Sequence, residues 1–228
     1  MSAVLSHASS GSALSFDPFT APTRSVEPRR MAVLISGAGR TLENLLHVIG
    51  RGELDARVCV VISSVAEVRG LEIAASAGIP AITVRRSSFG SLGAYSEGIH
   101  AAAAPYAPDF FVMAGFLRKM LVLPGWEGRI LNIHPALLPE AAPYAAGRGL
   151  FGERVHAAVL AHGDHRSGAT VHVVTDDYDA GPPLARVEVP VRDGDTPATL
   201  AARVFAAECA LYPAAIRDFI ARLPSPED

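Results

Sequence analysis

Cysteine is scarce in this sequence, with only Cys59 and Cys209 in 228 residues. Two cysteines give neither a disulfide framework nor the paired spacing of a metal site, so a reducing compartment fits and we expect the cytoplasm. Lys and Arg form no dense tract, and a net charge of -3 argues against a nucleic-acid partner, because phosphate neutralisation needs clustered cations. No apolar stretch approaches the roughly 20 residues that span a bilayer, so we expect a soluble protein without a membrane partner.

The first thirty residues lack the apolar segment of a secretory signal and are rich in serine and proline. We predict a flexible N-terminal extension over residues 1–30, followed by one domain over residues 31–228. Half of the residues are hydrophobic, which is enough for one good core. A translation start at Met31 is one alternative for the extension. A transit peptide is another, although Asp17 and Glu27 do not suit its acid-poor composition.

From Met31 onward, short apolar runs rich in β-branched residues alternate with helical stretches. The runs cover residues 31–36, 56–63, 80–85, 109–115 and 128–134, and the helical stretches cover residues 41–52, 69–78 and 94–107. This alternation predicts βαβ units, and hence an α/β fold with a Rossmann-like, mostly parallel twisted sheet flanked by helices. A Pro/Ala/Gly-rich loop at 135–150, a helix at 152–163, strands at 168–175 and 184–191, and a final helix from about Asp195 follow.

The turn after the first strand, Gly-Ala-Gly-Arg-Thr at residues 37–41, lacks the third glycine of a dinucleotide fingerprint, and no Walker lysine follows it. The second strand ends in Ser63 and Ser64 rather than in the acidic residue that binds the ribose of NAD. Helix N-termini offer free N–H groups and a partial positive charge, so the turn could bind a phosphate. An ordinary tight turn is the alternative. The residues concerned are Gly37, Gly39, Arg40 and Thr41.

Asn132 and His134 lie near the end of the predicted strand at 128–134, just before Pro135. Residues two apart on a strand share a face, so both side chains point to one spot at the carboxyl end of the sheet, where α/β proteins bind ligands. An amide donor beside an imidazole can stabilise an oxyanion, and the imidazole can move protons near neutral pH. A buried structural histidine beside a turn-forming asparagine is the alternative.

An acidic turn follows the strand at 168–175 and contains Asp176, Asp177 and Asp179. Solvated turn carboxylates are one interpretation, and the spacing does not match a calcium loop. A carboxylate brought next to His134 would fix its tautomer and favour its charged form, which predicts a His134 pKa above the ordinary value of ~6.5. The sequence therefore suggests an Asn–His–Asp set.

Four stretches together resemble the folate-dependent formyltransferase family, and the match spans nearly all of residues 31–223. The stretches are VMAGFLRKML at 112–121, ILNIHPALLP at 130–139, GATVHVVTDDYDAGP at 168–182 and RVFAAECALYP at 203–213. The resemblance implies the formyltransferase fold and a transferase of one-carbon metabolism and purine biosynthesis. Such an enzyme passes the formyl group of 10-formyltetrahydrofolate, its co-substrate, to the amine of glycinamide ribonucleotide, and it requires no metal.

The resemblance also assigns roles to particular residues. Asn132 and His134 would donate to the oxyanion of the tetrahedral intermediate, while Asp179 would pair with His134 and relay the proton of the amine. Gly37, Gly39, Arg40 and Thr41 would bind the substrate phosphate, and Glu208 would contact its ribose. The pterin pocket would be lined by Leu117, Arg118, Lys119, Met120, Ile130, Thr175 and Asp176.

The chain departs from the family at the phosphate turn, which usually resembles Gly-Asn-Gly-Ser-Asn; here the turn is Gly-Ala-Gly-Arg-Thr, so two side-chain amides are absent and the guanidinium of Arg40 is added. A sugar-nucleotide N-formyltransferase is an alternative function within the family. An NADP-dependent reductase, with Ser63, Ser64 and Arg69 near a 2′-phosphate, and a non-catalytic nucleotide-binding module are alternatives outside it. We expect small-molecule partners only, with the protein a monomer or a homodimer.

Overall fold

The computed structural model describes residues 27–224, so most of the predicted N-terminal extension lies outside the described residues. The strands are β1 (Arg29–Ile35), β2 (Ala56–Ser63), β3 (Ala81–Thr83), β4 (Phe110–Met113), β5 (Ile130–His134), β6 (Arg166–Val173) and β7 (Pro183–Pro190). The first strand begins two residues before Met31, because Arg29 and Arg30 already pair with Ala56 and Arg57 of β2. The predicted start of the first strand at Met31 is therefore two residues late.

Helices lie in most of the connections between the strands, and the longest helix follows the last strand. They are α1 (Arg40–Gly50), α2 (Arg69–Ser76), α3 (Leu92–Ala103), α4 (Ala142–Ala145), α5 (Glu153–His162) and α6 (Pro197–Ile220), with short 3-10 turns η1 (Arg86–Ser88) and η2 (Ala104–Tyr106). The sequence did not predict α4, a single turn inside the Pro/Ala/Gly-rich loop. The other helices lie where the apolar periodicity placed them.

The seven strands form one sheet in the order β3-β2-β1-β4-β5-β6-β7. Strands β1 to β5 run parallel, while β6 is antiparallel to β5 and β7 is antiparallel to β6. This arrangement confirms the predicted mostly parallel sheet flanked by helices. The chain order reverses at β1, which has β2 on one side and β4 on the other, and ligands of open α/β sheets bind at the carboxyl edge beside such a reversal.

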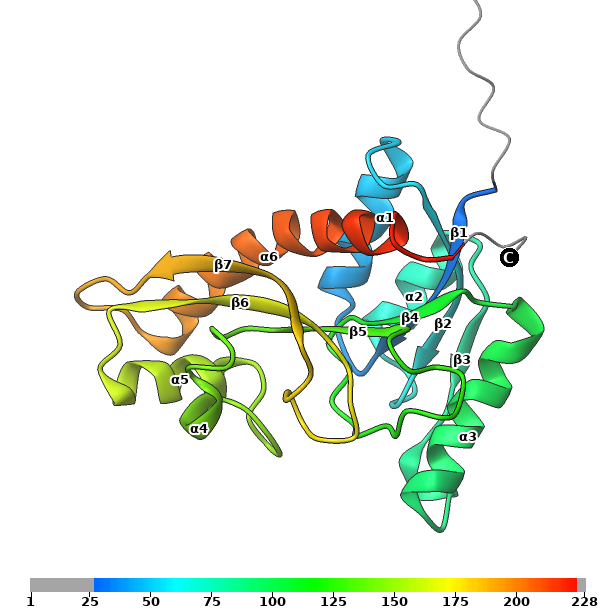
Figure 1. The fold of residues 1–228 in the computed structure, drawn as a ribbon, viewed down its shortest axis with the longest axis horizontal. Coiled ribbons are helices and arrows are strands. Elements are labelled where there is room, and N and C mark those ends of the chain that lie inside the picture. Colours follow the sequence, from blue (N-terminus) through cyan, green and yellow to red (C-terminus); the bar gives the residue numbers. More distant parts are fainter. Residues whose placement is uncertain (1–26, 225–228) are drawn as a thin grey trace, which may run out of the picture.

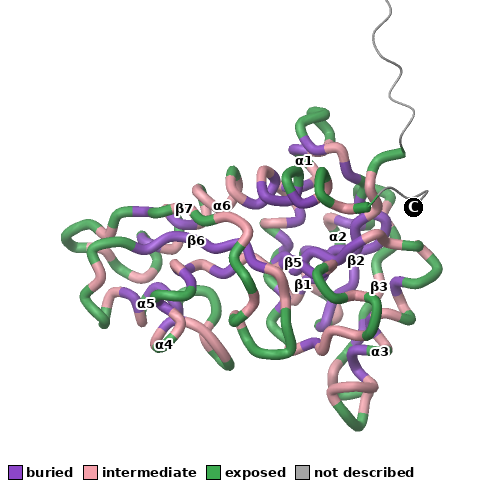
Figure 2. Tube along the Cα trace, viewed as in Figure 1, coloured by how far each residue is buried: buried purple, intermediate pink, exposed green. Residues whose placement is uncertain are grey.

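Buried residues follow the central strands of the sheet, as Figure 2 shows. One apolar cluster joins β1, β2 and β4 to α1 and the second half of α6, and another packs the opposite faces of these strands against α3. A third cluster joins α5, β6, β7 and the first half of α6. Helix α6 therefore runs along both halves of the sheet, beside β6 and β7 and on toward α1 (Figure 1).

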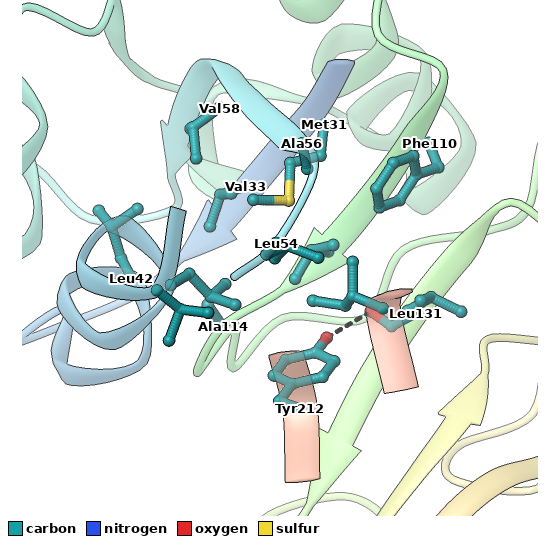
Figure 3. Packing of buried hydrophobic residues seen from close by; sticks show 14 of the residues in the cluster. Met31, Val33, Leu42, Leu54, Ala56, Val58, Phe110, Ala114, Leu131 and Tyr212 are labelled. Carbon is teal, nitrogen blue, oxygen red and sulfur yellow. Dashed lines mark hydrogen bonds between the residues drawn. The ribbon is translucent and has the colours of Figure 1, made fainter. Parts of the chain in front are cut away.

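Helix α6 is anchored at its first turn and again at Tyr212, past its midpoint. Thr196 caps its first turn by accepting a hydrogen bond from the backbone N–H of Thr199. Further along, the buried Tyr212 hydroxyl lies 3.0 Å from the Met113 carbonyl oxygen, at the end of β4, and 3.1 Å from that of Leu131, near the start of β5. Figure 3 shows the bond to Leu131, which ties α6 to the sheet. By length and composition α6 could span a membrane, so the expectation that no stretch approaches that length was wrong. Its buried face packs on the sheet.

Candidate active site

A cavity of about 900 Å³ lies at the carboxyl edge of the sheet, between the segments that follow β1, β4 and β5 and the first half of α6. Its position agrees with the topology, because the reversal of chain order at β1 splays these segments apart. Many residues predicted from the sequence line this one cavity: Arg40, Thr41, Leu117, Arg118, Lys119, Asn132, His134, Asp179 and Glu208.

Asn132 is oriented by a histidine on the neighbouring strand. The antiparallel register places Asn132 opposite His172, and Asn132 Nδ2 is 3.1 Å from His172 Nε2. His172 Nδ1 lies 3.0 Å from the Val173 carbonyl oxygen, which only accepts, so neutral His172 carries its proton on Nδ1 and its Nε2 is an acceptor. One N–H of the Asn132 amide therefore donates to His172. The second N–H of the same amide is not used by His172, and the Asn132 side chain lines the cavity.

His134 is almost fully buried, and each of its ring nitrogens faces an acceptor. Nε2 donates to the Ala145 carbonyl oxygen of α4 over 2.7 Å, and Nδ1 is 3.7 Å from Asp179 Oδ1. Burial lowers the pKa of His134, and this outweighs Asp179 and the Ala145 carbonyl, which raise it. The expectation that the His134 pKa lies above its ordinary value was wrong, because desolvation of the imidazolium exceeds the attraction of one carboxylate.

Asp179 stands between the two histidines. Its Oδ1 is 3.7 Å from His134 Nδ1 and 3.7 Å from His172 Nε2, and its Oδ2 accepts a hydrogen bond of 3.0 Å from the Gly147 N–H. Burial would raise the pKa of this carboxyl group, but the interactions with His172, His134 and the Gly147 N–H outweigh it, so the pKa of Asp179 is lowered. The residue adopts a left-handed backbone with φ of 52°, which Asp tolerates better than most residues. The acidic turn thus places one charged carboxylate, that of Asp179, beside His134 and His172.

A second group of residues lies on the cavity wall, where α1 begins beside α6. The guanidinium carbon of Arg40 is 3.7 Å from the ring centroid of Phe205, and Thr41 and Glu208 lie on the same wall. Burial raises the pKa of Glu208 to about 7, although the charge of Arg40 pulls it down. A carboxyl group near its pKa at neutral pH can both donate and accept hydrogen bonds.

The glycines of the phosphate turn do not line the cavity. Gly39 has a left-handed φ of 73°, and a Cβ atom there would lie 2.5 Å from Gly70 Cα, so this glycine permits close packing of α1 on α2. The Gly37 carbonyl oxygen accepts a hydrogen bond from the Gly70 N–H over 3.1 Å. The structure therefore gives Gly37 and Gly39 structural contacts, while Arg40 and Thr41 are the residues of this turn that reach the cavity.

The residues predicted for the pterin pocket divide into two groups. Leu117, Arg118 and Lys119, which follow β4, line the cavity. Met120 and Ile130 are 2% and 1% exposed and belong to the apolar core around α3, so they do not face the cavity. Thr175 and Asp176 also lie off its wall. The Asp176 carboxylate accepts a hydrogen bond from the Val122 N–H over 2.9 Å, which fastens the segment after β4 to the acidic turn.

Three residues on or beside the cavity were not singled out from the sequence. His172 orients Asn132, yet only the antiparallel register reveals their pairing. His156 on α5 lines the cavity with a buried Nδ1 that has no hydrogen-bond partner, and burial lowers the pKa of His156 to about 4, with His134 adding to the effect. Phe205 sits one helical turn before Glu208, and this spacing could have indicated it. Within residues 27–224, no group of three or more His, Cys, Asp or Glu side chains is arranged so that it could hold a metal ion.

A family model described as formyl transferase matches residues 29–216. The chain therefore belongs to the formyl transferase family. It is 37% identical over 191 residues to phosphoribosylglycinamide formyltransferase of Escherichia coli, covering 83% of this chain and 86% of that protein. The protein of the same name from Mycobacterium tuberculosis is 41% identical over 191 residues, covering 83% and 84%. The crystal structure of glycinamide ribonucleotide transformylase 1 from Symbiobacterium toebii superposes with a TM-score of 0.77 at 36% identity, covering 95% of each chain.

Proposed function

We propose that this chain transfers the formyl group of 10-formyltetrahydrofolate to the amine of 5′-phosphoribosylglycinamide, a step of purine biosynthesis. The observation that carries the proposal is the convergence of Asn132, His134 and Asp179 on one cavity, next to a wall that bears Arg40 and Glu208. Relatives that carry this name cover most of this chain and are mostly covered by it.

The proposed reaction begins with attack of the amine nitrogen on the formyl carbon. A carbon–nitrogen bond forms, and the electron pair of the carbonyl bond moves onto the formyl oxygen. The Asn132 N–H that His172 does not use would donate to this oxyanion. Donors that are already oriented stabilise such charge most strongly, because no reorganisation is needed during the reaction. His172 therefore serves as a positioning residue for the Asn132 amide.

His134 would supply a second donor once the formyl oxygen replaces the Ala145 carbonyl oxygen as the acceptor of its Nε2 proton. The ring is neutral in this environment, because burial lowers the pKa of His134. A neutral imidazole with its proton on Nε2 can donate at Nε2 and accept a proton at Nδ1. Asp179 lies 3.7 Å from Nδ1, so the imidazolium that forms transiently faces a carboxylate.

The proton lost by the amine must reach N10 of the folate, so that the bond between the formyl carbon and N10 can break. Asp179 is the charged acceptor nearest to His134, and its lowered pKa keeps it ionised at neutral pH. We infer that Asp179, with His134 and water, carries this proton from the amine toward the leaving nitrogen. Atoms and charge then balance without a further reactant.

The cavity also accommodates the non-reacting parts of both substrates. Arg40 and Thr41 are suited to the phosphate of the ribonucleotide, and Glu208 to the hydroxyl groups of its ribose. Leu117, Arg118 and Lys119 line the cavity after β4, where the folate would lie. We propose these two small molecules as the partners of a cytoplasmic enzyme that acts as a monomer or a homodimer; Cys59 and Cys209, both free thiols, fit a reducing compartment.

The reductase alternative loses its support because its residues have other partners. Ser63 and Ser64 are buried, the Ser63 hydroxyl donates to the Val65 carbonyl oxygen over 2.5 Å, and the Ser64 hydroxyl lies 2.7 Å from that of Ser36. Arg69 forms an ion pair of 2.8 Å with Glu43. Both serine hydroxyls therefore already have partners within the protein, and Arg69 already has a carboxylate as its counter-ion.

Asn132→Ala tests the proposal at the oxyanion. We expect kcat to fall by ~10²- to 10³-fold with the fold intact, which is the usual loss for one oxyanion donor. Asn44→Ala is the matched control, because Asn44 is the only other asparagine of the sequence and its amide donates outside the cavity, to the Cys209 carbonyl oxygen. Parent-like kcat in a folded Asn132→Ala variant would contradict the assigned role.

A further inference from the structure

Arg40 makes an unusual contact for a residue at the start of a helix. Its guanidinium carbon stacks 3.7 Å above the ring centroid of Phe205, which comes from α6 at the far end of the sequence. Both side chains line the cavity, beside Thr41 and Glu208. The stack therefore lies inside the proposed substrate site and joins α1 and α6, the two helices that form the cavity wall with Thr41 and Glu208.

The contact leaves the hydrogen-bonding capacity of Arg40 unused. A guanidinium group stacks through its flat face, so its five N–H donors at the edge stay available. Within residues 27–224, the Arg40 side chain takes part in no hydrogen bond and in no ion pair shorter than 4.0 Å. Other arginines differ: Arg203 binds Asp195 through two nitrogens, and Arg69 binds Glu43.

We propose that Phe205 is a positioning residue that holds the Arg40 guanidinium edge-on to the cavity, so that Arg40 binds the phosphate of the acceptor substrate through two N–H donors. This inference rests on the proposed function and deepens it. Pairing of a guanidinium with a phosphate through two parallel hydrogen bonds needs a fixed plane, which a flexible arginine alone does not provide. The aromatic ring fixes that plane without using a donor.

The surroundings of Arg40 favour an anion as the missing partner. No side chain caps the N-terminus of α1, which begins at Arg40, so no side chain neutralises the partial positive charge of this helix end. Glu43, the acidic residue of the first turn, is already paired with Arg69. The turn itself, Gly-Ala-Gly-Arg-Thr at residues 37–41, contains no side-chain amide, so Arg40 is its only charged donor.

Such a phosphate contact is made equally in the ground state and in the transition state. Weakening it should therefore raise KM for the ribonucleotide and leave kcat unchanged. A residue with a purely structural role would lower kcat or the folate affinity as well. A rise in KM for the ribonucleotide without a change in kcat thus distinguishes a residue that positions Arg40 from one that only maintains the structure of the site.

The experiment compares Phe205→Leu, Phe205→Tyr, Arg40→Ala and the double variant Phe205→Leu/Arg40→Ala. Phe205→Leu keeps apolar bulk but removes the π face, and we expect KM for the ribonucleotide to rise about two- to fivefold, the equivalent of an exposed cation–π contact. Phe205→Tyr should restore the parent value. The double variant should be no worse than Arg40→Ala, because the ring acts only through the guanidinium.

Calorimetric titration with ribose 5-phosphate measures the same contact without turnover. Its Kd should rise by the same factor as KM in Phe205→Leu, and Arg69→Ala should not change it, since Arg69 has the same charge but does not line the cavity. Additive effects of Phe205→Leu and Arg40→Ala, or a change in kcat or folate KM, would overturn the inference. Dependence of ribose 5-phosphate binding on both residues, without any formyl transfer, would overturn the proposed function and leave the anion site standing.

Discussion

The buried carboxyl group of Glu208 makes the stability of the fold depend on pH, and its contribution is smallest at neutral pH and above. Burial raises the pKa of its carboxyl group from 4.5 to about 7. The unfolded chain therefore releases this proton at lower pH than the native protein does. Between about pH 4.5 and 7 the native state binds more protons, so stability falls as pH rises through this window, and the loss is complete above pH 7. Each pKa unit corresponds to about 1.4 kcal/mol, which makes the loss about 3 kcal/mol.

Replacement by glutamine removes the titration and keeps the shape. We predict that Glu208→Gln increases the free energy of unfolding by about 3 kcal/mol above pH 7.5 and by much less below pH 4.5. Urea denaturation at a series of pH values, followed by the fluorescence of Trp126, the only tryptophan of the sequence, measures both quantities. Glu72→Gln on the exposed face of α2 is the control. An equal gain at every pH, or a loss above pH 7.5, would refute the desolvation argument.

Two further predictions concern His134 and the loop that contacts it. Asp179→Asn should lower the pKa of His134 still further, because the carboxylate is the main influence that raises it, and kcat should fall as well. NMR titration of His134 measures this pKa, and an unchanged value would mean that Asp179 does not act on His134. Tyr144→Phe removes a hydrogen bond of 2.5 Å to Asp164 that ties α4 to the end of α5. We expect amide exchange near Ala145 to become roughly fivefold faster, equivalent to about 1 kcal/mol, as hydrogen-exchange measurements would show.

The sequence could predict the features that depend on local pattern. Alternation of β-branched runs with amphipathic stretches predicted the parallel sheet, because periodicity and strand length are local properties. Leu117, Arg118 and Lys119 after β4, and Asn132 and His134 of β5, line one cavity, since the carboxyl ends of parallel strands share one edge. The prediction that Asn132 and His134 share one face of β5 needed only the two-residue period of a strand.

Features that depend on packing could not be read from the sequence. The pairing of Asn132 with His172 follows from the antiparallel register of β5 and β6, which no local pattern fixes. The direction of the His134 pKa depends on the balance between burial and one carboxylate, and burial appears only in the folded protein. Met120 follows the cavity residues Leu117, Arg118 and Lys119 in the sequence, but its side chain is buried in the apolar cluster around α3.

The most direct test of the central claim is the transfer reaction itself, measured with the purified chain, 10-formyltetrahydrofolate and 5′-phosphoribosylglycinamide. Release of the deformylated folate is followed by absorbance, and the formylated ribonucleotide is identified by mass spectrometry. A matched assay replaces the acceptor with an amino sugar nucleotide, and an Asp179→Asn variant serves as the inactive reference. The account predicts stoichiometric formyl transfer to the ribonucleotide, little transfer to the amino sugar nucleotide and a sharp loss in the variant. Preferred formylation of the amino sugar nucleotide, or equal rates for the parent and Asp179→Asn, would contradict it.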